Sequence, residues 1–247
     1  MSLSHKHNII IVRYLIATIG LFFVALGIAL SIITNLGTSP LSCPAYVMEG
    51  VWGLTVGNWT ILINMLYLVI QVAVLRKRFK LMFLTQILAT VVFGYLIDFS
   101  LFICQWLHPA GIVSKLAILL IACFVSAIGI STEVMAKAWM LSAEMTVYAF
   151  TKVTKAKFNN IKIIMDSSLV VISALLAYMM HGNWFGFGEY DGIKNVLLGN
   201  TEGVVIGLGT LIMAIMSGWM MKITDPIVDR ILDKLIFNLI YNRYEEK

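Results

Sequence analysis

The sequence has few charged residues, few cysteines and few prolines for its length. Only 13% of its 247 residues carry a charge and 60% are hydrophobic, whereas an ordinary soluble domain has about 25% charged residues. A soluble fold must cover its surface with polar groups, and this chain has too few of them. The composition therefore excludes a soluble globular domain and indicates a protein of the lipid bilayer.

The chain also lacks the patterns of several function classes. Its three cysteines, Cys43, Cys104 and Cys123, show no metal-ligand or redox spacing. It has no Ser-His-Asp order, phosphate-binding loop or ligand cluster, so we expect no enzyme activity, metal or cofactor. The net charge of +5 does not indicate nucleic acid, because the basic residues stand in short clusters between apolar runs.

Six apolar runs are long enough to cross a bilayer, which needs about 20 residues. Each should be a helix, because backbone polar groups in lipid must pair within their own segment. The first run lacks a cleavage pattern and is expected to stay as the first span. We expect an all-α, polytopic fold with spans near 9–34, 58–75, 81–107, 114–136, 161–181 and 203–222.

Lysine and arginine predict the orientation of these spans. Sixteen of them flank the spans on the side of both chain ends, against two, Lys115 and Lys194, on the other side. Cytoplasmic loops of membrane proteins carry an excess of Lys and Arg. We therefore expect both termini in the cytoplasm, which requires an even number of spans.

The chain resembles itself at an offset of 102 residues. The pairs Gly27/Gly129 and Tyr46/Tyr148 are the informative ones, since apolar matches are common in membrane proteins. The halves would be 1–107 and 108–222, each with three spans, and the outer loop 182–202 interrupts the register. Because three is odd, the second half enters the membrane in the opposite direction. Secondary transporters have such inverted repeats, although a duplication also arises as a convenience of folding.

Each half has a long, moderately apolar segment after its first span, at 35–57 and at 137–160. Such a segment either re-enters the membrane beside a cavity lined by protein or lies as a helix along the lipid headgroups. The sequence leaves both alternatives open. The first segment contains a helix-breaking turn made of Gly37, Thr38, Ser39 and Pro40.

Glycine-based motifs resemble those of a known family, the YczE/YitT-like bacterial membrane proteins. The resemblance covers the six spans and not the C-terminal tail, and residues 137–142 depart from the second Leu-Gly-x-x-Pro turn of that family. It implies a multi-pass protein of the bacterial inner (cytoplasmic) membrane and supplies no substrate. The motifs are Gly27-Ile28-Ala29-Leu30-Ser31, Leu36-Gly37-Thr38-Ser39-Pro40, Gly53-Leu54-Thr55-Val56-Gly57-Asn58-Trp59-Thr60 and Gly207-Leu208-Gly209-Thr210-Leu211.

Carboxylates inside a membrane are costly, so each is a candidate for function. Three acids qualify, and the residues 102 positions before them are polar but neutral. Two tyrosines that are themselves a repeat pair flank both sets. We expect these residues to form a substrate- or ion-binding site between the halves, with the acids toward the cytoplasm. The residues are Glu133, Glu144 and Asp166, their partners Ser31, Ser42 and Asn64, and the tyrosines Tyr46 and Tyr148.

The alternative for the acids is structural. Lys137 follows Glu133 by four residues, and Lys162 precedes Asp166 by four. Residues four apart share a helix face, so both pairs are also expected as ion pairs that serve stability alone.

The C-terminal tail, 223–247, has the pattern of an amphipathic helix. Thr224-Asp225-Pro226 predicts its capped start, and apolar residues recur on one face after it. Such a helix either lies on the membrane or pairs with a second copy, so a homodimer is one expectation.

Together these patterns predict a small transporter or exporter that works by alternating access. Its substrate, a small molecule or an ion, is not written in the sequence, and the acids favour coupling to a cation or a proton. The alternative is a non-transport membrane component, such as a sensor or an assembly partner. The tail and the aromatic outer loop 182–202 would suit that alternative.

The predicted orientation is testable by cysteine labelling. In a variant without native cysteines, Lys77→Cys should react with a membrane-impermeant maleimide only after the inner face is opened. Asn183→Cys should react in intact cells and serves as the matched control. Labelling of Lys77→Cys in intact cells would contradict the arrangement of six spans with both termini inside.

Overall fold

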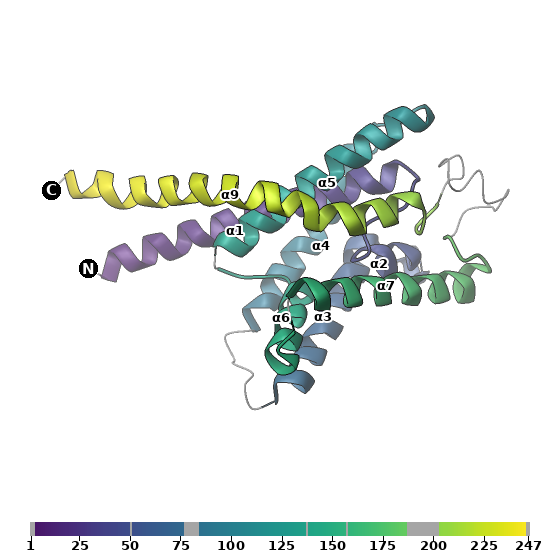
Figure 1. The fold of residues 1–247 in the computed structure, drawn as a ribbon, viewed down its shortest axis with the longest axis horizontal. Coiled ribbons are helices and arrows are strands. Elements are labelled where there is room, and N and C mark those ends of the chain that lie inside the picture. The colour runs from purple at the N-terminus through teal and green to yellow at the C-terminus, as the bar shows by residue number, and fades with distance from the viewer. Residues whose placement is uncertain are drawn as a thin grey trace.

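The structure, a computed structural model, describes residues 3–49, 51–76, 84–136, 138–156, 158–186 and 203–245. Over these ranges the chain is helical, with one isolated bridge between Gly186 and Val204. The two ends of the chain lie at the same end of the molecule (Figure 1). Lys77, Lys137 and most of the predicted outer loop are outside the described residues.

Six long helices and three short ones make up the described part of the chain. The long helices are α1 (Leu3–Ile33), α3 (Val56–Leu75), α4 (Thr85–Cys104), α5 (Gly111–Ala136), α7 (Phe158–His181) and α9 (Leu208–Glu245). The short ones are α2 (Cys43–Val47), α6 (Ser142–Thr154) and the 3-10 helix η1 (Val51–Gly53).

Five of the long helices, α1, α3, α4, α5 and α7, are long and apolar enough to cross a membrane. α9 consists of two parts, Leu208–Met216 and Gly218–Leu232, which meet at a bend of 42°. If these two parts together form one span, the chain has six spans. The prediction of an all-α membrane protein is confirmed. The bounds of the first five spans agree with the predicted ones to within a few residues, whereas the last helix begins at Leu208 and not at 203.

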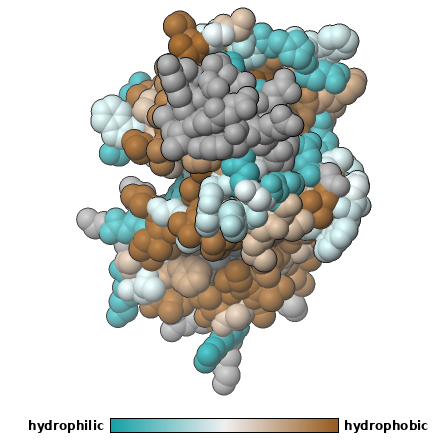
Figure 2. Space-filling view, turned by 90° about the vertical axis from the view of Figure 1, so that its right-hand side faces the viewer, coloured by the Kyte–Doolittle hydropathy of each residue, from teal (hydrophilic) through white to brown (hydrophobic). Residues whose placement is uncertain are grey.

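Large apolar side chains face outward from the spans. Leu66, Phe102 and Ile164 are each about 60% exposed, at 59%, 65% and 64%. Figure 2 shows one face of the molecule, where apolar residues gather over the lower half. An exposed apolar surface of this extent needs an apolar environment, and the hydrocarbon of the bilayer provides it.

The helices α1 and α5 cross at the centre of the molecule in close contact (Figure 1). A Cβ atom on Gly20 would lie 2.8 Å from the carbonyl oxygen of Gly129, and one on Gly27 would lie 2.8 Å from that of Ala122. The contact therefore moves backward along α5 as it moves forward along α1, so the two helices run antiparallel. Only glycine permits this approach of the two backbones.

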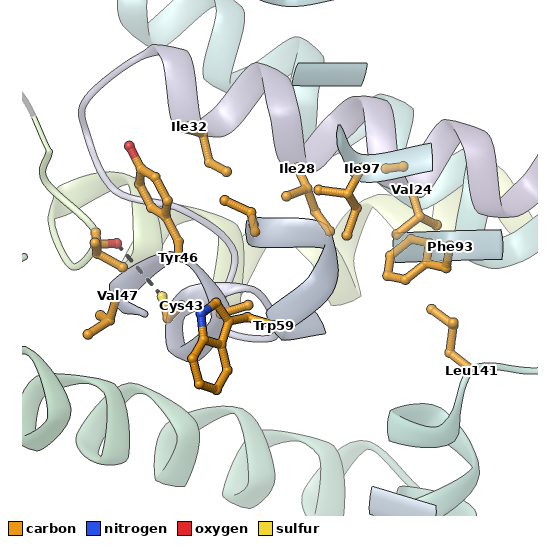
Figure 3. Packing of buried hydrophobic residues seen from close by; sticks show 14 of the residues in the cluster. Val24, Ile28, Ile32, Cys43, Tyr46, Val47, Trp59, Phe93, Ile97 and Leu141 are labelled. Atoms are coloured by element: carbon orange, nitrogen blue, oxygen red, sulfur yellow. Dashed lines mark hydrogen bonds between the residues drawn. The ribbon is translucent and has the colours of Figure 1, made fainter. Parts of the chain in front are cut away.

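The other helices pack around this crossing. α4 lies against α1 and α3, and α9 lies against α5. Figure 3 shows Val24 and Ile28 of α1 beside Phe93 and Ile97 of α4 in the main apolar core. The short helix α2 packs against α7, and α6 packs against α3, so each half of the chain supplies a short helix to the other half.

The helix-breaking turn after α1 lies inside the protein. Gly37 has a φ of +109°, which glycine tolerates best. The Leu36 carbonyl accepts a hydrogen bond from the Gly209 amide at 2.7 Å, and the Thr38 amide donates to the Val205 carbonyl at 3.0 Å. All five residues of α2 are buried. This burial favours a segment inserted in the protein over a helix lying along the headgroups.

The predicted helix start at Thr224 is wrong, because α9 continues through Pro226. The Ser131 hydroxyl on α5 donates to Asp225 Oδ1 at 2.6 Å and lies 2.8 Å from the Thr224 hydroxyl. These side chains therefore attach α9 to α5 and do not begin a new helix. The change of direction occurs earlier, between Met216 and Gly218.

The close crossing generates a stability prediction. Gly129→Ala should lower the free energy of unfolding by about 1–3 kcal/mol, the usual cost of overpacking, because its Cβ would meet the Gly20 carbonyl oxygen at 2.7 Å. Gly218→Ala is the matched control: a Cβ there has no neighbour within 4 Å, so the change should stabilise the helix by about 0.5–1 kcal/mol. Thermal unfolding of the purified protein in detergent distinguishes them, and equal stability of the two variants would contradict the crossing.

Candidate functional site

A cavity of about 40 Å³ lies between the two halves of the chain. Its walls come from α1, the turn at 39–41, α5, α6, α7 and α9. A water molecule needs roughly 10–15 Å³ of such space, so the cavity holds about three waters or one small ion. Three charged side chains reach it, namely Glu144, Lys162 and Asp166.

Asp166 and Lys162 form an ion pair on α7. The Lys162 ammonium lies 3.3 Å from Asp166 Oδ2 and 3.5 Å from Oδ1. The side chains are 22% and 16% exposed. This is the pairing at a spacing of four residues that the structural alternative predicts, so Asp166 is already neutralised.

Glu144 is buried in the first turn of α6 and is 4% exposed. Its Oε2 atom has no hydrogen-bond partner among the described residues. Burial raises the pKa of this carboxyl above its ordinary value, and the charge of Lys162 acts in the opposite direction. Of the two acids in the cavity, Glu144 is thus the one without an ion-pair partner among the described residues.

Glu133 lies apart from the cavity wall and connects two helices. It is 1% exposed, and its Oε1 accepts a hydrogen bond from the Leu141 amide at 2.6 Å. Leu141 is the residue before α6, so Glu133 at the end of α5 satisfies a backbone donor at the start of α6. Its predicted partner Lys137 lies outside the described residues, and that ion pair stays a prediction.

The neutral residues of the first half form a chain of hydroxyl groups. Ser31 and Thr38 lie 2.9 Å apart, and Thr38 and Ser42 also lie 2.9 Å apart. Ser31 therefore reaches across to the segment before α2, just as Glu133 reaches across to the segment before α6. From the same turn, Ser39 and Pro40 line the cavity.

The last three predicted residues are not placed together. Asn64 is buried, its Nδ2 donates to the Thr60 carbonyl at 3.0 Å, and its Oδ1 has no partner in the described part of the chain. Tyr46 packs in the apolar core (Figure 3). Tyr148 is 42% exposed, with the Lys152 ammonium 4.6 Å from its ring centre. Among the predicted residues, the structure brings Glu144, Asp166, Ser39 and Pro40 to one cavity.

Sequence reasoning missed a buried amide pair. Gln71 Nε2 on α3 donates to Gln86 Oε1 at 3.1 Å and to the Ser142 carbonyl at 2.7 Å. Gln86 Nε2 on α4 donates back to Gln71 Oε1 at 3.2 Å. The signal was present, because a glutamine near the end of an apolar span needs a polar partner. The pair fixes the start of α6, which carries Glu144.

Asp98 on α4 also makes specific contacts in the structure. Its carboxylate accepts hydrogen bonds from the Thr55 hydroxyl at 2.7 Å and from the Gly57 amide at 2.9 Å. Asp98 on α4 therefore caps the first turn of α3.

Comparisons with known proteins place the chain among proteins without an assigned activity. The model of a family of unknown function (DUF6198) matches residues 11–190. The uncharacterised protein YyaS of Bacillus subtilis (strain 168) is 24% identical over 220 residues, which cover 87% of this chain and 94% of that protein. No solved structure matches significantly. The matched family bears a different name from the YczE/YitT-like one, so that resemblance stays a prediction.

The role of Glu133 is testable with two variants. Glu133→Gln keeps an oxygen acceptor for the Leu141 amide and should fold with little loss. Glu133→Leu leaves that buried amide unpaired and should cost about 1–3 kcal/mol of stability. Thermal unfolding in detergent measures both. An equal loss in both variants would mean that the negative charge itself is needed, as an ion pair with Lys137 would require.

Proposed function

We propose that this chain, which belongs to the DUF6198 family of unknown function, is a small membrane transporter working by alternating access. The main support is the antiparallel crossing of α1 and α5, because the residues in contact there are related by the offset of 102 residues. We further propose that it lies in the inner (cytoplasmic) membrane of a bacterium, with both termini in the cytoplasm. A homodimer is not part of this proposal.

The contacts at the crossing support an inverted repeat. Gly20 meets Gly129, which is the repeat partner of Gly27. Gly27 in turn meets Ala122, which is the repeat partner of Gly20. Exchanging the two halves therefore converts one contact into the other, as a two-fold axis between α1 and α5 requires.

The packing of the other helices supports the same relation. At the offset of 102 residues α2 corresponds to part of α6, and α3 corresponds to α7. α2 packs against α7 while α6 packs against α3, and these two contacts are again exchanged when the halves are exchanged. Secondary transporters built from inverted repeats use this kind of two-fold relation to alternate between an outward-open and an inward-open state.

The cavity lies where such a transporter binds its cargo. Val24 with Ser126 and Ile28 with Ile130 are repeat pairs, and all four residues line it. Binding at the interface of the repeats, beside interrupted helices, is the usual arrangement. The cavity is too small for an organic molecule in this state, so we assign this structure to a closed state of the cycle.

The junction between the turn at Gly37 and the start of α9 fits the outer closure of this cycle. The predicted orientation puts both segments on the outer side. Direct backbone contacts join them, including the Gly209–Leu36 hydrogen bond of 2.7 Å and the Thr38–Val205 hydrogen bond of 3.0 Å. A movement of α9 relative to α1 that breaks these bonds would open the cavity outward. A sensor would not need paired contacts of this kind.

Accessibility of the cavity from both sides tests the proposal. In a variant without native cysteines, Ser126→Cys should react with an impermeant maleimide from either face of the membrane. Thr38→Cys and Val205→Cys can be added at the Thr38–Val205 hydrogen bond of the junction. Oxidising them should join the outer junction, abolish labelling from outside and preserve labelling from inside.

The control for this experiment is the same protein after reduction, in which outside labelling should return. The single variants Thr38→Cys and Val205→Cys, each combined with Ser126→Cys, should not respond to oxidation. Labelling from one face alone, unchanged by oxidation, would exclude alternating access.

A further inference from the structure

The charges in the cavity do not balance. Two carboxylates, Glu144 and Asp166, and one ammonium, Lys162, line it. Lys162 lies within 3.5 Å of both Asp166 oxygens, so Glu144 has no cation of its own among the residues that the structure describes. A buried carboxylate without a partner is strongly unfavourable, and the cavity therefore requires one more positive charge.

No other described side chain around the cavity supplies that charge. α3, which packs against α6, carries Tyr67 and Asn64, whose hydroxyl and Oδ1 atoms have no partners among the described residues. α2, which packs against α7, carries the thiol of Cys43, and α5 carries a further acid, Glu133, apart from the cavity wall. From α1 and α9 the lining is apolar, and the residues of α4 that approach α6 are neutral. Within the described part of the chain, the remaining source of this charge is the solution.

The geometry favours a proton over a metal or organic cation. A metal ion such as Mg²⁺ or Ca²⁺ requires about six oxygen ligands, whereas the unpartnered oxygens on the cavity wall belong to Glu144 and Ser126. The Lys162 ammonium shares the same small space and would repel a second cation. A proton needs one oxygen and almost no volume, and Glu144 Oε2 offers that oxygen.

We propose that Glu144 binds one proton at Oε2 and that this proton is the coupling ion of the transport cycle. Binding forms one O–H bond with a proton from water and neutralises the cavity. When the proton leaves, the Lys162 ammonium moves toward Glu144 and is shared between the two carboxylates. The coupling role rests on the proposed transport function, whereas the proton site itself does not.

Infrared spectroscopy of the full-length protein in lipid nanodiscs tests the site. The wild type should show the carbonyl band of a protonated carboxyl group, which disappears as the pH is raised. Glu133, whose Oε2 is also buried without a partner among the described residues, would give a band of its own, so the comparison is made in a Glu133→Gln background. There, Glu144→Gln should lack this band, and Asp166→Asn should keep it. Lys162→Gln is the second variant: without the ammonium, Asp166 also needs a proton, so the band should grow.

Thermal unfolding at constant ionic strength is the independent measurement. Because burial raises the pKa of Glu144 in the folded state, the folded protein binds this proton more tightly than the unfolded chain. The Tm of the wild type should therefore fall as the pH rises through that pKa, and Glu144→Gln should lose this fall. Sodium, potassium and choline chloride should give the same curves.

Three results would overturn the assignment. A band that Asp166→Asn removes and Glu144→Gln keeps would move the proton to Asp166. A rise in Tm at high pH with sodium or potassium, absent in Glu144→Gln, would make the occupant a metal cation. A wild type without the band would exclude a bound proton. Because the labelling of Ser126→Cys is independent of these readings, failure of the proton site and failure of alternating access are distinguishable.

Discussion

The close approach of α1 and α5 is the contact around which the molecule is built. Two helices in a bilayer gain no hydrophobic energy from one another, so they associate through close packing and polar contacts. Gly20, Gly27 and Gly129 allow the backbones to touch. The antiparallel direction of this contact then sets which helices meet on either side, and it leaves the small cavity beside the crossing.

The two halves bridge the interruption after their first helix with different side chains. In each half the first helix ends and a buried short helix follows, and a side chain from the end of the first helix must bridge that interruption. In the first half the bridge is the neutral hydroxyl of Ser31, joined to Thr38. In the second half it is the carboxylate of Glu133, bonded to the Leu141 amide. The interruption after the first helix thus occurs in both halves, and the bridging side chain carries a carboxyl group only in the second half.

The sequence predicted most of the fold, because span length and composition are local properties. It also identified Glu144 and Asp166 as candidate site residues, since the cost of a carboxylate in lipid does not depend on the detailed packing. It did not predict that Tyr148 lies on the surface while Tyr46 is buried, because an offset relates positions along the chain and not the rotation of α6 about its axis. The bonds from Ser131 to Thr224 and Asp225 join residues more than 90 positions apart, so the capping pattern there was interpreted as local when it is tertiary.

The exchange of short helices between the halves has a consequence for biosynthesis. α2 packs against α3 and against α7, and α7 begins 111 residues after Val47. At about 5–20 residues per second the ribosome needs on the order of 10 s to deliver it. During that interval the first half is inserted in the membrane, and α2 does not yet have α7 to pack against. The nascent protein is therefore most exposed to quality-control proteases after its first spans have entered the bilayer and before its fifth has arrived.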